Sequence, residues 1–456
     1  MRTVRIGAGQ GFYGDSLLPA IDVAKYGNVK YISFDTLAEL TLAILEKGKK
    51  KDPTQGYAKD VIPMMRNLLP ICAERGIKLI TNAGGINPPG AAKAVAQVAR
   101  ELGLKGLKIA CVTGDDIYDR LDELAAQGVA FRDKETGQEL GDVRERVHFA
   151  SVYLGARPIA DALDQGADVV ITGRTTDTAQ FLGPLIHEFG WGPTEWNKLA
   201  QGILLGHLME CSGQVSGGNF QVGWEEIPAL ERIGYPVSEV SEDGSFILTK
   251  PEGTGGAVTL NTVKEQFLYE IHDPTAYLTP DVIVDLTTTT LEEVGENQVK
   301  VSGTVGRPAP PTLKALLGYA DGWMGEGYIS FSWPKAYSKA KRAAEIVLKR
   351  LEMQGVAPEE TRLEYIGINS LWGAMAPEPV DEDTINEVRL RIAIRTQKKQ
   401  DCEVLAREFP PLLLSGPPTA SAVAGTPAPR ELMGLWSTLI PRELIEPHTR
   451  VLVEEV

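Results

Sequence analysis

The sequence predicts an α/β protein with an N-terminal, doubly wound and mostly parallel sheet and a second α+β domain. In the first half of the chain, short apolar runs alternate with segments of helical pattern, which is the order of βαβ units. These runs are apolar at nearly every position, as strands are when helices cover both faces of their sheet. In the second half, apolar and polar residues alternate within each run, which is typical of a sheet covered on one face.

The N-terminal domain is predicted to span residues 1–235. Its ligand crevice should lie outside the carboxyl ends of the strands, so the polar residues that follow each strand are the candidates for a site. One helix is expected over 194–212, capped by Thr194 and ended by Gly213. The expected strands are VRIG (4–7), VKYISFD (29–35), IKLITNA (77–83), LKIACVTG (107–114), VHFASVYLG (147–155) and ADVVITG (167–173).

The second domain is predicted to span residues 236–456. A long amphipathic helix is expected over 338–355, with Ser338 as its N-cap and Gly355 after its last turn. The proline-rich stretch 409–430 is expected to form an extended crossing or loop. The expected strands are SFILTK (245–250), DVIVDL (281–286), QVKVSGT (298–304), YISFSW (328–333), LEYIGI (363–368) and EVRLRIAI (387–394).

The composition limits the class of protein. The chain has 456 residues, with 46 Lys and Arg against 61 Asp and Glu, and its net charge of −15 disfavours a general nucleic-acid binder. No stretch is long and apolar enough to cross a bilayer, and the first residues show no signal-peptide pattern. The four cysteines lie far apart without a C-x-x-C pair, which is typical of free thiols in a reducing compartment. We therefore expect a cytoplasmic enzyme with no membrane partner.

The glycine-rich start IGAGQGFYG is close to a dinucleotide fingerprint. Gly9, Gly11 and Gly14 have the spacing G-x-G-x-x-G, and Asp35 lies about 20 residues further on, where such folds place the acid that binds a ribose. The preceding strand is very short, however, and glycine-rich turns also occur in doubly wound domains that bind no dinucleotide. Binding of NAD(P) therefore stands beside a structural or anion-binding turn.

The loop TNAGGINPPG follows the third expected strand. Gly84 and Gly85 let backbone N–H groups approach a ligand, and Asn82 and Asn87 add amide groups. Such a loop can bind a carboxylate, a phosphate or an oxyanion through its peptide N–H groups. The alternative is a wide turn that needs glycine for its backbone angles alone.

Two further strand ends carry charge. Asp115 lies beyond its strand in TGDD, as a helix cap or as a group that moves a proton. In ITGRTTDTA, Arg174 would project into the crevice as a fork for a carboxylate or phosphate, and Asp177 would lie in the first turn of the next helix. A structural pair between Arg174 and an aspartate is the alternative.

The segment HLMEC places three reactive side chains on one helical face. His207, Glu210 and Cys211 are spaced i, i+3 and i+4. A histidine beside a cysteine can activate a thiolate, and a histidine with a glutamate can act as acid and base. The same three residues are zinc ligands in other proteins, but no second ligand cluster is evident and we predict no metal site. A buried, inert cysteine is the remaining alternative.

The segment PEGTGGAVT is the last candidate. Gly253, Thr254, Gly255 and Gly256 precede a helix-like segment, and N–H groups at a helix N-terminus form a ready anion site. The segment lacks the lysine of a Walker loop, which disfavours nucleotide hydrolysis.

Five of these segments and a sixth, DPTAYLTPDV, together carry a family resemblance. GAGQGFYGD, ITNAGGINP, ITGRTTDTA, HLMECSGQVSGGNF, KPEGTGGAVT and DPTAYLTPDV follow one another along nearly the whole chain. In this combination the chain resembles the acyclic terpene utilisation family AtuA. The resemblance implies catabolism of acyclic terpenoids and related branched carboxylates, as acyl-CoA derivatives. Longer relatives carry a C-terminal ferredoxin-like domain, so the chain is similar to the short form, which implies a small ferredoxin-like companion subunit.

These candidates predict a site for a small anionic carbonyl compound, with the loops near residues 84, 174, 211 and 255 around one pocket. That inventory suits a hydro-lyase, which adds or removes water β to a carbonyl and must stabilise an enolate. A CoA thioester is then the expected form of the substrate. An NAD(P)-dependent oxidoreductase and a non-catalytic scaffold subunit are the alternatives, and a divalent metal stays open. We also expect a homo-oligomer, because symmetric assemblies of identical chains are frequent among enzymes.

Overall fold

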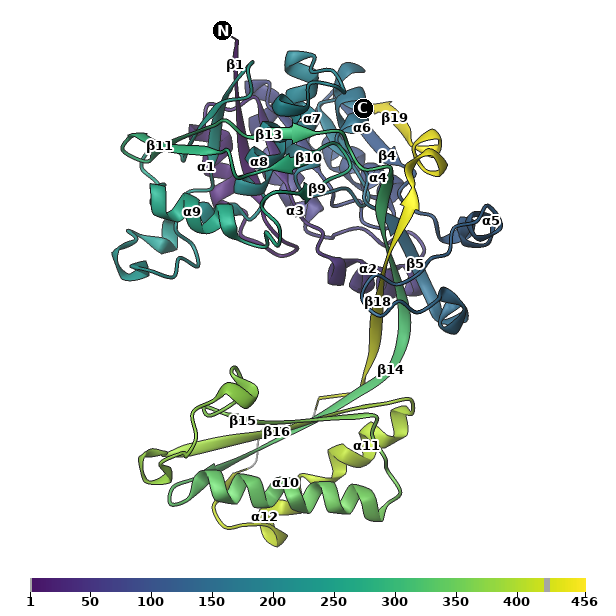
Figure 1. Ribbon diagram of the computed structural model, residues 1–456, viewed down its shortest axis with the longest axis vertical. Coiled ribbons are helices and arrows are strands. Elements are labelled where there is room, and N and C mark those ends of the chain that lie inside the picture. The colour runs from purple at the N-terminus through teal and green to yellow at the C-terminus, as the bar shows by residue number, and fades with distance from the viewer. Residues whose placement is uncertain (1, 422–426) are drawn as a thin grey trace. The chain divides into compact units, whose positions relative to one another are not determined.

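The computed structural model describes residues 2–421 and 427–456, and it has the expected α/β fold (Figure 1). The chain divides into two compact units. The first contains the residues up to Gly318 together with Leu435–Val456, and the second is Tyr319–Gly434. All the candidate site residues belong to the first unit.

The main sheet of the first unit has a parallel centre and antiparallel edges. Its strand order is β11-β12-β8-β7-β1-β2-β3-β6-β4-β19, and the pairs from β1 to β4 in this order are all parallel. The parallel strands are β1 (Thr3–Gln10), β2 (Tyr31–Phe34), β3 (Lys78–Thr81), β4 (Lys108–Thr113) and β6 (Val169–Ile171). The antiparallel strands are β7 (Val237–Ser241), β8 (Phe246–Thr249), β11 (Thr290–Gly295), β12 (Gln298–Ser302) and β19 (Arg450–Glu455).

Helices cover both faces of this sheet, as the apolar strands predicted. Ile32 and Phe34 of β2 belong to the hydrophobic core that also contains residues of α1 (Leu18–Tyr26), α3 (Val61–Arg75) and α4 (Pro88–Glu101). Between them in the strand, the Ser33 hydroxyl donates to a carbonyl of α7 (Ala179–Phe189). Because successive side chains of a strand point to opposite faces, α7 lies on the other face. It packs there with α6 (Arg157–Asp164) and α8 (Trp196–Met209).

The first unit differs from the prediction in two places. The run VHFASVYLG forms β5 (Val147–Val152), but β5 pairs with β14 (Thr312–Ser332) and not with the main sheet, where β3 and β4 already flank β6 on both sides. The boundary predicted at residue 236 is also not where the compact units divide. Strand β7 pairs antiparallel with β1 and so extends the first sheet. Alternating polarity indicates one covered face, but it does not show which sheet a strand joins.

The remaining elements of the first unit lie around the sheet. Strands β13, β10 and β9 form a small sheet of their own in that order. The bounds are α2 (Glu39–Lys51), α5 (Leu121–Ala126), α9 (Leu260–Leu268), β9 (Tyr277–Leu278), β10 (Ile283–Asp285) and β13 (Val305–Arg307). In the described residues, no helix is both long enough and apolar enough to cross a membrane.

The second unit is an antiparallel sheet with helices on one face. Strand β16 (Glu387–Thr396) alternates as predicted, with Leu390 and Ile392 buried in a separate core and Arg389 and Arg391 between them. Helix α10 begins two residues before the predicted start, so Ser338 lies inside it and is not its cap. Residues 422–426 of the proline-rich stretch lie outside the described residues. The bounds are α10 (Ala336–Met353), β15 (Glu360–Ile366), α11 (Lys399–Glu408), α12 (Leu412–Ser415), β17 (Ala420–Ser421) and β18 (Arg430–Pro441), which leads back into the first unit.

Candidate functional site

The candidate site lies at the carboxyl ends of the central parallel strands. Asp35 follows β2, Asn82 follows β3, and Arg174 follows β6 after a short turn. Strands β3 and β6 are neighbours in the sheet although β4 and β5 come between them in the chain. A position where the strand order skips in this way is where doubly wound sheets open a crevice for a ligand.

A buried amide network joins the ends of β2 and β3. The Asn82 side chain donates to the Asp35 carboxylate (Nδ2 to Oδ1, 2.6 Å) and accepts from the backbone N–H of Thr36 (2.7 Å). The Gln180 side chain accepts from the Asn82 backbone N–H (3.1 Å) and donates to the same Asp35 oxygen (3.3 Å). The Asn82 side chain therefore holds Asp35, which the sequence indicated only as a ribose-binding acid of a dinucleotide site.

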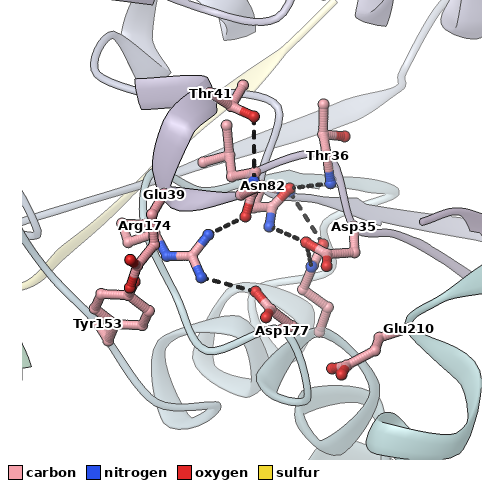
Figure 2. Close-up of polar contacts among 12 residues, drawn as sticks. Asp35, Thr36, Glu39, Thr41, Asn82, Tyr153, Arg174, Asp177 and Glu210 are labelled. Atoms are coloured by element: carbon pink, nitrogen blue, oxygen red, sulfur yellow. Dashed lines mark hydrogen bonds and ion pairs between the residues drawn. The ribbon is translucent and has the colours of Figure 1, made fainter. Parts of the chain in front are cut away.

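Arg174 occupies the centre of the cluster (Figure 2). Its side chain is buried, with 3% of its surface accessible, and it donates to the Asp177 carboxylate (Nη2 to Oδ1, 2.9 Å) and to the Leu37 carbonyl. The Tyr153 ring lies 4.3 Å from the guanidinium carbon. The backbone N–H of Arg174 donates to Asp115 (2.7 Å), and burial raises the pKa of Asp115 to about 7. The predicted fork thus binds a residue of its own chain.

Glu39 and Lys314 hold in place the Tyr153 ring that lies against Arg174. The Tyr153 hydroxyl and the Lys314 ammonium both donate to one oxygen of Glu39 (2.6 Å each). Lys314 also lies 4.9 Å from the centre of the Tyr153 ring. The three side chains come from segments far apart in the chain, and β5 and β14 bring Tyr153 and Lys314 together by pairing. The sequence carries no periodic signal for this arrangement.

Three carboxyl groups face one another beside the guanidinium. Figure 2 shows Asp35, Asp177 and Glu210 on the same side of Arg174. Burial raises the pKa of all three groups, and the charge of Asp177 raises the pKa values of Asp35 and Glu210 further. Arg174 opposes the rise in each case. The Asp177 side chain keeps 36% of its surface accessible, whereas Glu210 keeps 7%, so solvent reaches Asp177 far more readily.

The end of α8 supplies the predicted trio of His207, Glu210 and Cys211. His207 Nδ1 lies 3.5 Å from the near oxygen of Glu210, and burial lowers the pKa of the imidazole. Burial raises the pKa of the Cys211 thiol, which disfavours an activated thiolate. In the described part of the chain, no three His, Cys, Asp or Glu side chains are placed to hold a metal ion.

Buried polar atoms without a hydrogen-bond partner in the described residues gather at this site. They include Nε of Arg174, Oε2 of Glu210 and Nε2 of His207. The hydroxyl groups of Thr175, Thr176 and Thr178 share this property. Because unsatisfied buried polar groups are rare and costly, such a concentration is typical of a site that binds a polar ligand. Thr178 is the N-cap residue of α7, which begins at Ala179, but its side chain makes no capping hydrogen bond.

The TNAGGINPPG loop is packed tightly beside this site. A Cβ at Gly84 would lie 2.4 Å from the Thr172 carbonyl oxygen, and one at Gly85 would lie 2.4 Å from Leu45. Asn87 caps α4 through the N–H of Gly90 (3.1 Å) and donates to the carbonyl groups of Thr54 and Gln55. These contacts explain both glycines and Asn87 structurally, and their binding of a substrate stays a prediction.

The segment 253–256 packs against Ser216, in the turn that follows α8. The N–H of Gly255 donates to the backbone carbonyl of Arg232, and the N–H of Gly256 donates to that of Pro228. The Thr254 hydroxyl donates to the Pro251 carbonyl. A Cβ at Gly256 would lie 2.6 Å from the Ser216 carbonyl oxygen, whereas Gly253 has no atom that near. Helix α9 begins only at Leu260, with Thr259 as its N-cap. The N–H groups of Gly255 and Gly256 therefore support the local fold, and binding of a substrate by this segment stays a prediction.

The glycine-rich start is used for close packing. Gly9 lies inside β1, and a Cβ there would lie 2.2 Å from the Phe34 ring. A Cβ at Gly11 would lie 2.9 Å from the backbone carbon of Cys211. Asp35, the expected ribose-binding acid, is buried and bonded to Asn82. This arrangement favours the structural interpretation of the segment over a dinucleotide turn.

Comparison with known proteins identifies the family. No curated protein and no solved structure matches the chain. The sequence model of the acyclic terpene utilisation family protein AtuA matches residues 4–451, which is nearly the whole chain. The family gives the chain a role in acyclic terpene utilisation, which is a catabolic function. The chain belongs to the acyclic terpene utilisation family AtuA.

Proposed function

We propose that the chain is a catabolic enzyme of the hydro-lyase type, in which Asp177 is the general base and Glu210 the general acid. The observation that carries this proposal is the difference between the two carboxyl environments. Asp177 is bonded to Arg174 and reached by solvent, whereas Glu210 is buried and one of its oxygens has no partner in the described residues. Two carboxyl groups in such different environments can hold opposite protonation states at one pH.

The proposed elimination uses both groups. Asp177 removes a proton from the carbon next to the substrate carbonyl, and the electron pair of that C–H bond forms the new double bond. Glu210 gives its proton to the hydroxyl group on the β carbon, so that the C–O bond breaks and water leaves. Addition of water is the same path reversed. Each group ends the step in the state that the other began in, and solvent restores both.

As the proton leaves, negative charge develops on the carbonyl oxygen of the substrate, and this charge needs hydrogen-bond donors. Nε of Arg174 and the hydroxyl groups of Thr175, Thr176 and Thr178 are donors without a partner in the described residues. Donors arranged before the reaction stabilise developing negative charge most effectively where water is excluded. These atoms support the assignment of the substrate carbonyl oxygen to this edge of the sheet.

The substrate class proposed here is a branched carboxylate or its CoA thioester. The family's role in acyclic terpene utilisation supports a branched aliphatic chain. The four free cysteines support a cytoplasmic location. A small ferredoxin-like companion subunit and a homo-oligomeric state remain part of the proposal.

The test is turnover by the purified full chain. We expect loss of absorbance from a branched α,β-unsaturated acyl-CoA without added nicotinamide, as water adds to the double bond. Asp177→Asn and Glu210→Gln should each lower kcat at least about a hundredfold, which is the usual contribution of a positioned acid or base.

Matched controls are available on the surface. Asp122 is paired with Arg144 and Glu139 with Arg132, and both carboxyl groups are exposed. Asp122→Asn and Glu139→Gln should leave kcat unchanged. Turnover that requires NAD(P), or turnover that survives both site substitutions, would contradict the proposed chemistry. No turnover on any thioester, with partner binding retained in both site variants, would favour a scaffold subunit.

A further inference from the structure

A cavity lies within the first unit, apart from the candidate active site. Its volume is about 660 Å³, which is in the range of small-molecule binding sites. In the described residues, its lining shares no side chain with the cluster around Arg174. One loop separates the two places, because the Tyr153 ring contacts Arg174 while the next two residues, Leu154 and Gly155, line the cavity.

Most of the cavity wall is apolar. Residues from α7, α8, the start of β14 and β19 contribute to it, and the turn after α7 adds an indole ring. Contact with such a wall removes the hydrocarbon part of a ligand from water and so favours binding. The main apolar lining residues are Leu154, Ile186, Trp191, Leu199, Leu313 and Val451.

The acidic groups of the lining already have partners. Glu446 accepts from Arg442 (2.6 Å), and Arg442 also donates to the Pro280 and Pro310 carbonyl groups, so this arginine is committed to the protein. Asp281 accepts the N–H of Ala156 through both oxygens (2.9 and 3.1 Å). Burial raises the pKa of Asp281 to about 6, which weakens its repulsion of an anion in mildly acidic solution. Two of the three acids of the lining, Asp161 and Glu446, are therefore paired with arginines, and Arg442 offsets part of the charge of Asp281.

Arg157 is the cation of the lining whose terminal N–H groups are available to a ligand, as far as the described residues show. Its Nε donates to Asp161 (2.8 Å), while the side chain keeps 63% of its surface accessible. Arginine presents five N–H donors, and its two terminal nitrogens form a fork that matches a carboxylate. Its place in the lining thus puts one anion-binding group beside a large apolar wall.

We propose that this cavity binds an aliphatic monocarboxylate, with its hydrocarbon chain against the apolar wall and its carboxylate on Arg157. The proposal does not depend on the reaction assigned to Asp177 and Glu210. A saturated acid without a hydroxyl group cannot undergo that reaction, so binding at the cavity and turnover at the other site can be measured separately.

Titration calorimetry of the full chain with decanoate tests the ligand class. We expect saturable binding of one decanoate per chain, and weaker binding of decanol and decylamine. Arg157→Gln should raise the Kd about tenfold or more, which is the usual cost of losing a charge-assisted hydrogen bond. Arg132→Gln is the matched control, because Arg132 is equally exposed (64%) and also paired with an acid, and it should bind as the wild type does.

A second pair of variants locates the ligand. Ala309 lines the cavity and is partly exposed, so Ala309→Trp fills space there with little demand on the core, while Ala126→Trp adds the same ring at an exposed position elsewhere. Ala309→Trp should abolish decanoate binding, and Ala126→Trp and Asp177→Asn should preserve it. No saturable binding of decanoate would overturn the proposal. Equal affinity for decanol, or binding that survives both Arg157→Gln and Ala309→Trp, would overturn it as well.

Discussion

Glu210 links the chemistry of the site to the stability of the fold. Burial raises the pKa of its carboxyl well above the ordinary value, so the native chain keeps a proton there that the unfolded chain releases. The stability that this group contributes is therefore present below the pKa of the unfolded state and is lost as the pH rises through the pKa of the folded state. Each unit of this shift is worth about 1.4 kcal/mol.

Glu210→Gln should remove this dependence. A glutamine carries no charge at any pH, so we expect the variant to unfold less readily than the wild type at alkaline pH and nearly equally at pH 4. Urea unfolding at a series of pH values measures the difference. Glu139→Gln, at an exposed position, should show no such trend. A difference between Glu210→Gln and the wild type that does not grow with pH would contradict the raised pKa.

Arg174 shows at the same scale why a strand-end charge is ambiguous. Its position after a strand is what a substrate-binding fork needs, but its Nη atoms bind Asp177 and the Leu37 carbonyl. The residue therefore orients the proposed base, and only its Nε remains without a partner in the described residues. The position of an arginine in the sequence predicts where its guanidinium lies, but not which acceptor the guanidinium binds.

Gly11 determines how closely β1 approaches the end of α8. A Cβ at this residue would lie 2.9 Å from the Cys211 backbone carbon and 3.0 Å from the Glu210 carbonyl oxygen. Because both are backbone atoms, Gly11→Ala should push the end of α8 away from the sheet and move Glu210 relative to Asp177. We expect a loss of about 1–3 kcal/mol in stability from overpacking. We also expect kcat to fall about tenfold or more through misplacement of the acid.

The control for this prediction is a glycine with open space around it. Gly48 lies in α2, and a Cβ there would have no neighbouring atom within 4 Å, so Gly48→Ala should stabilise the helix by up to about 1 kcal/mol and leave kcat unchanged. Chemical unfolding and steady-state kinetics of both variants measure these effects. A Gly11→Ala variant with wild-type kcat would show that the packing of β1 on α8 does not position Glu210.

At the scale of elements, the sequence predicts the parallel strands and their polar ends but not how those ends are paired. The apolar runs match β1 to β4 and β6 within a few residues, because burial on both faces leaves a strong pattern. The same rule placed Asn82 and Arg174 at one edge. Lys314 was missed because the pairing of β5 with β14 brings it there. The segment 253–256 has the sequence of an anion-binding loop, but in the structure the N–H groups of Gly255 and Gly256 donate to the backbone carbonyl groups of residues 232 and 228.

At the scale of the whole molecule, each of the two units contains a hydrophobic core that the described residues of the other unit do not share. One core joins β2, β3 and the helices α1, α3 and α4 of the first unit, and it contains Leu79. The other joins β16 with α10 and α11 of the second unit, and it contains Leu390. The candidate site belongs wholly to the first unit. Units with separate cores can unfold as separate cooperative steps, so damage to one core should leave the other intact.

Leu79→Ala and Leu390→Ala test this division of the molecule. Both side chains are almost fully buried, so each truncation should cost about 2–5 kcal/mol in its own unit. By differential scanning calorimetry we expect each variant to lower the temperature of a different transition. Leu390→Ala should keep the wild-type kcat below its lowered transition, because Asp177 and Glu210 belong to the other unit. A single transition that both substitutions shift equally would contradict independent units, because it would require the two cores to unfold as one.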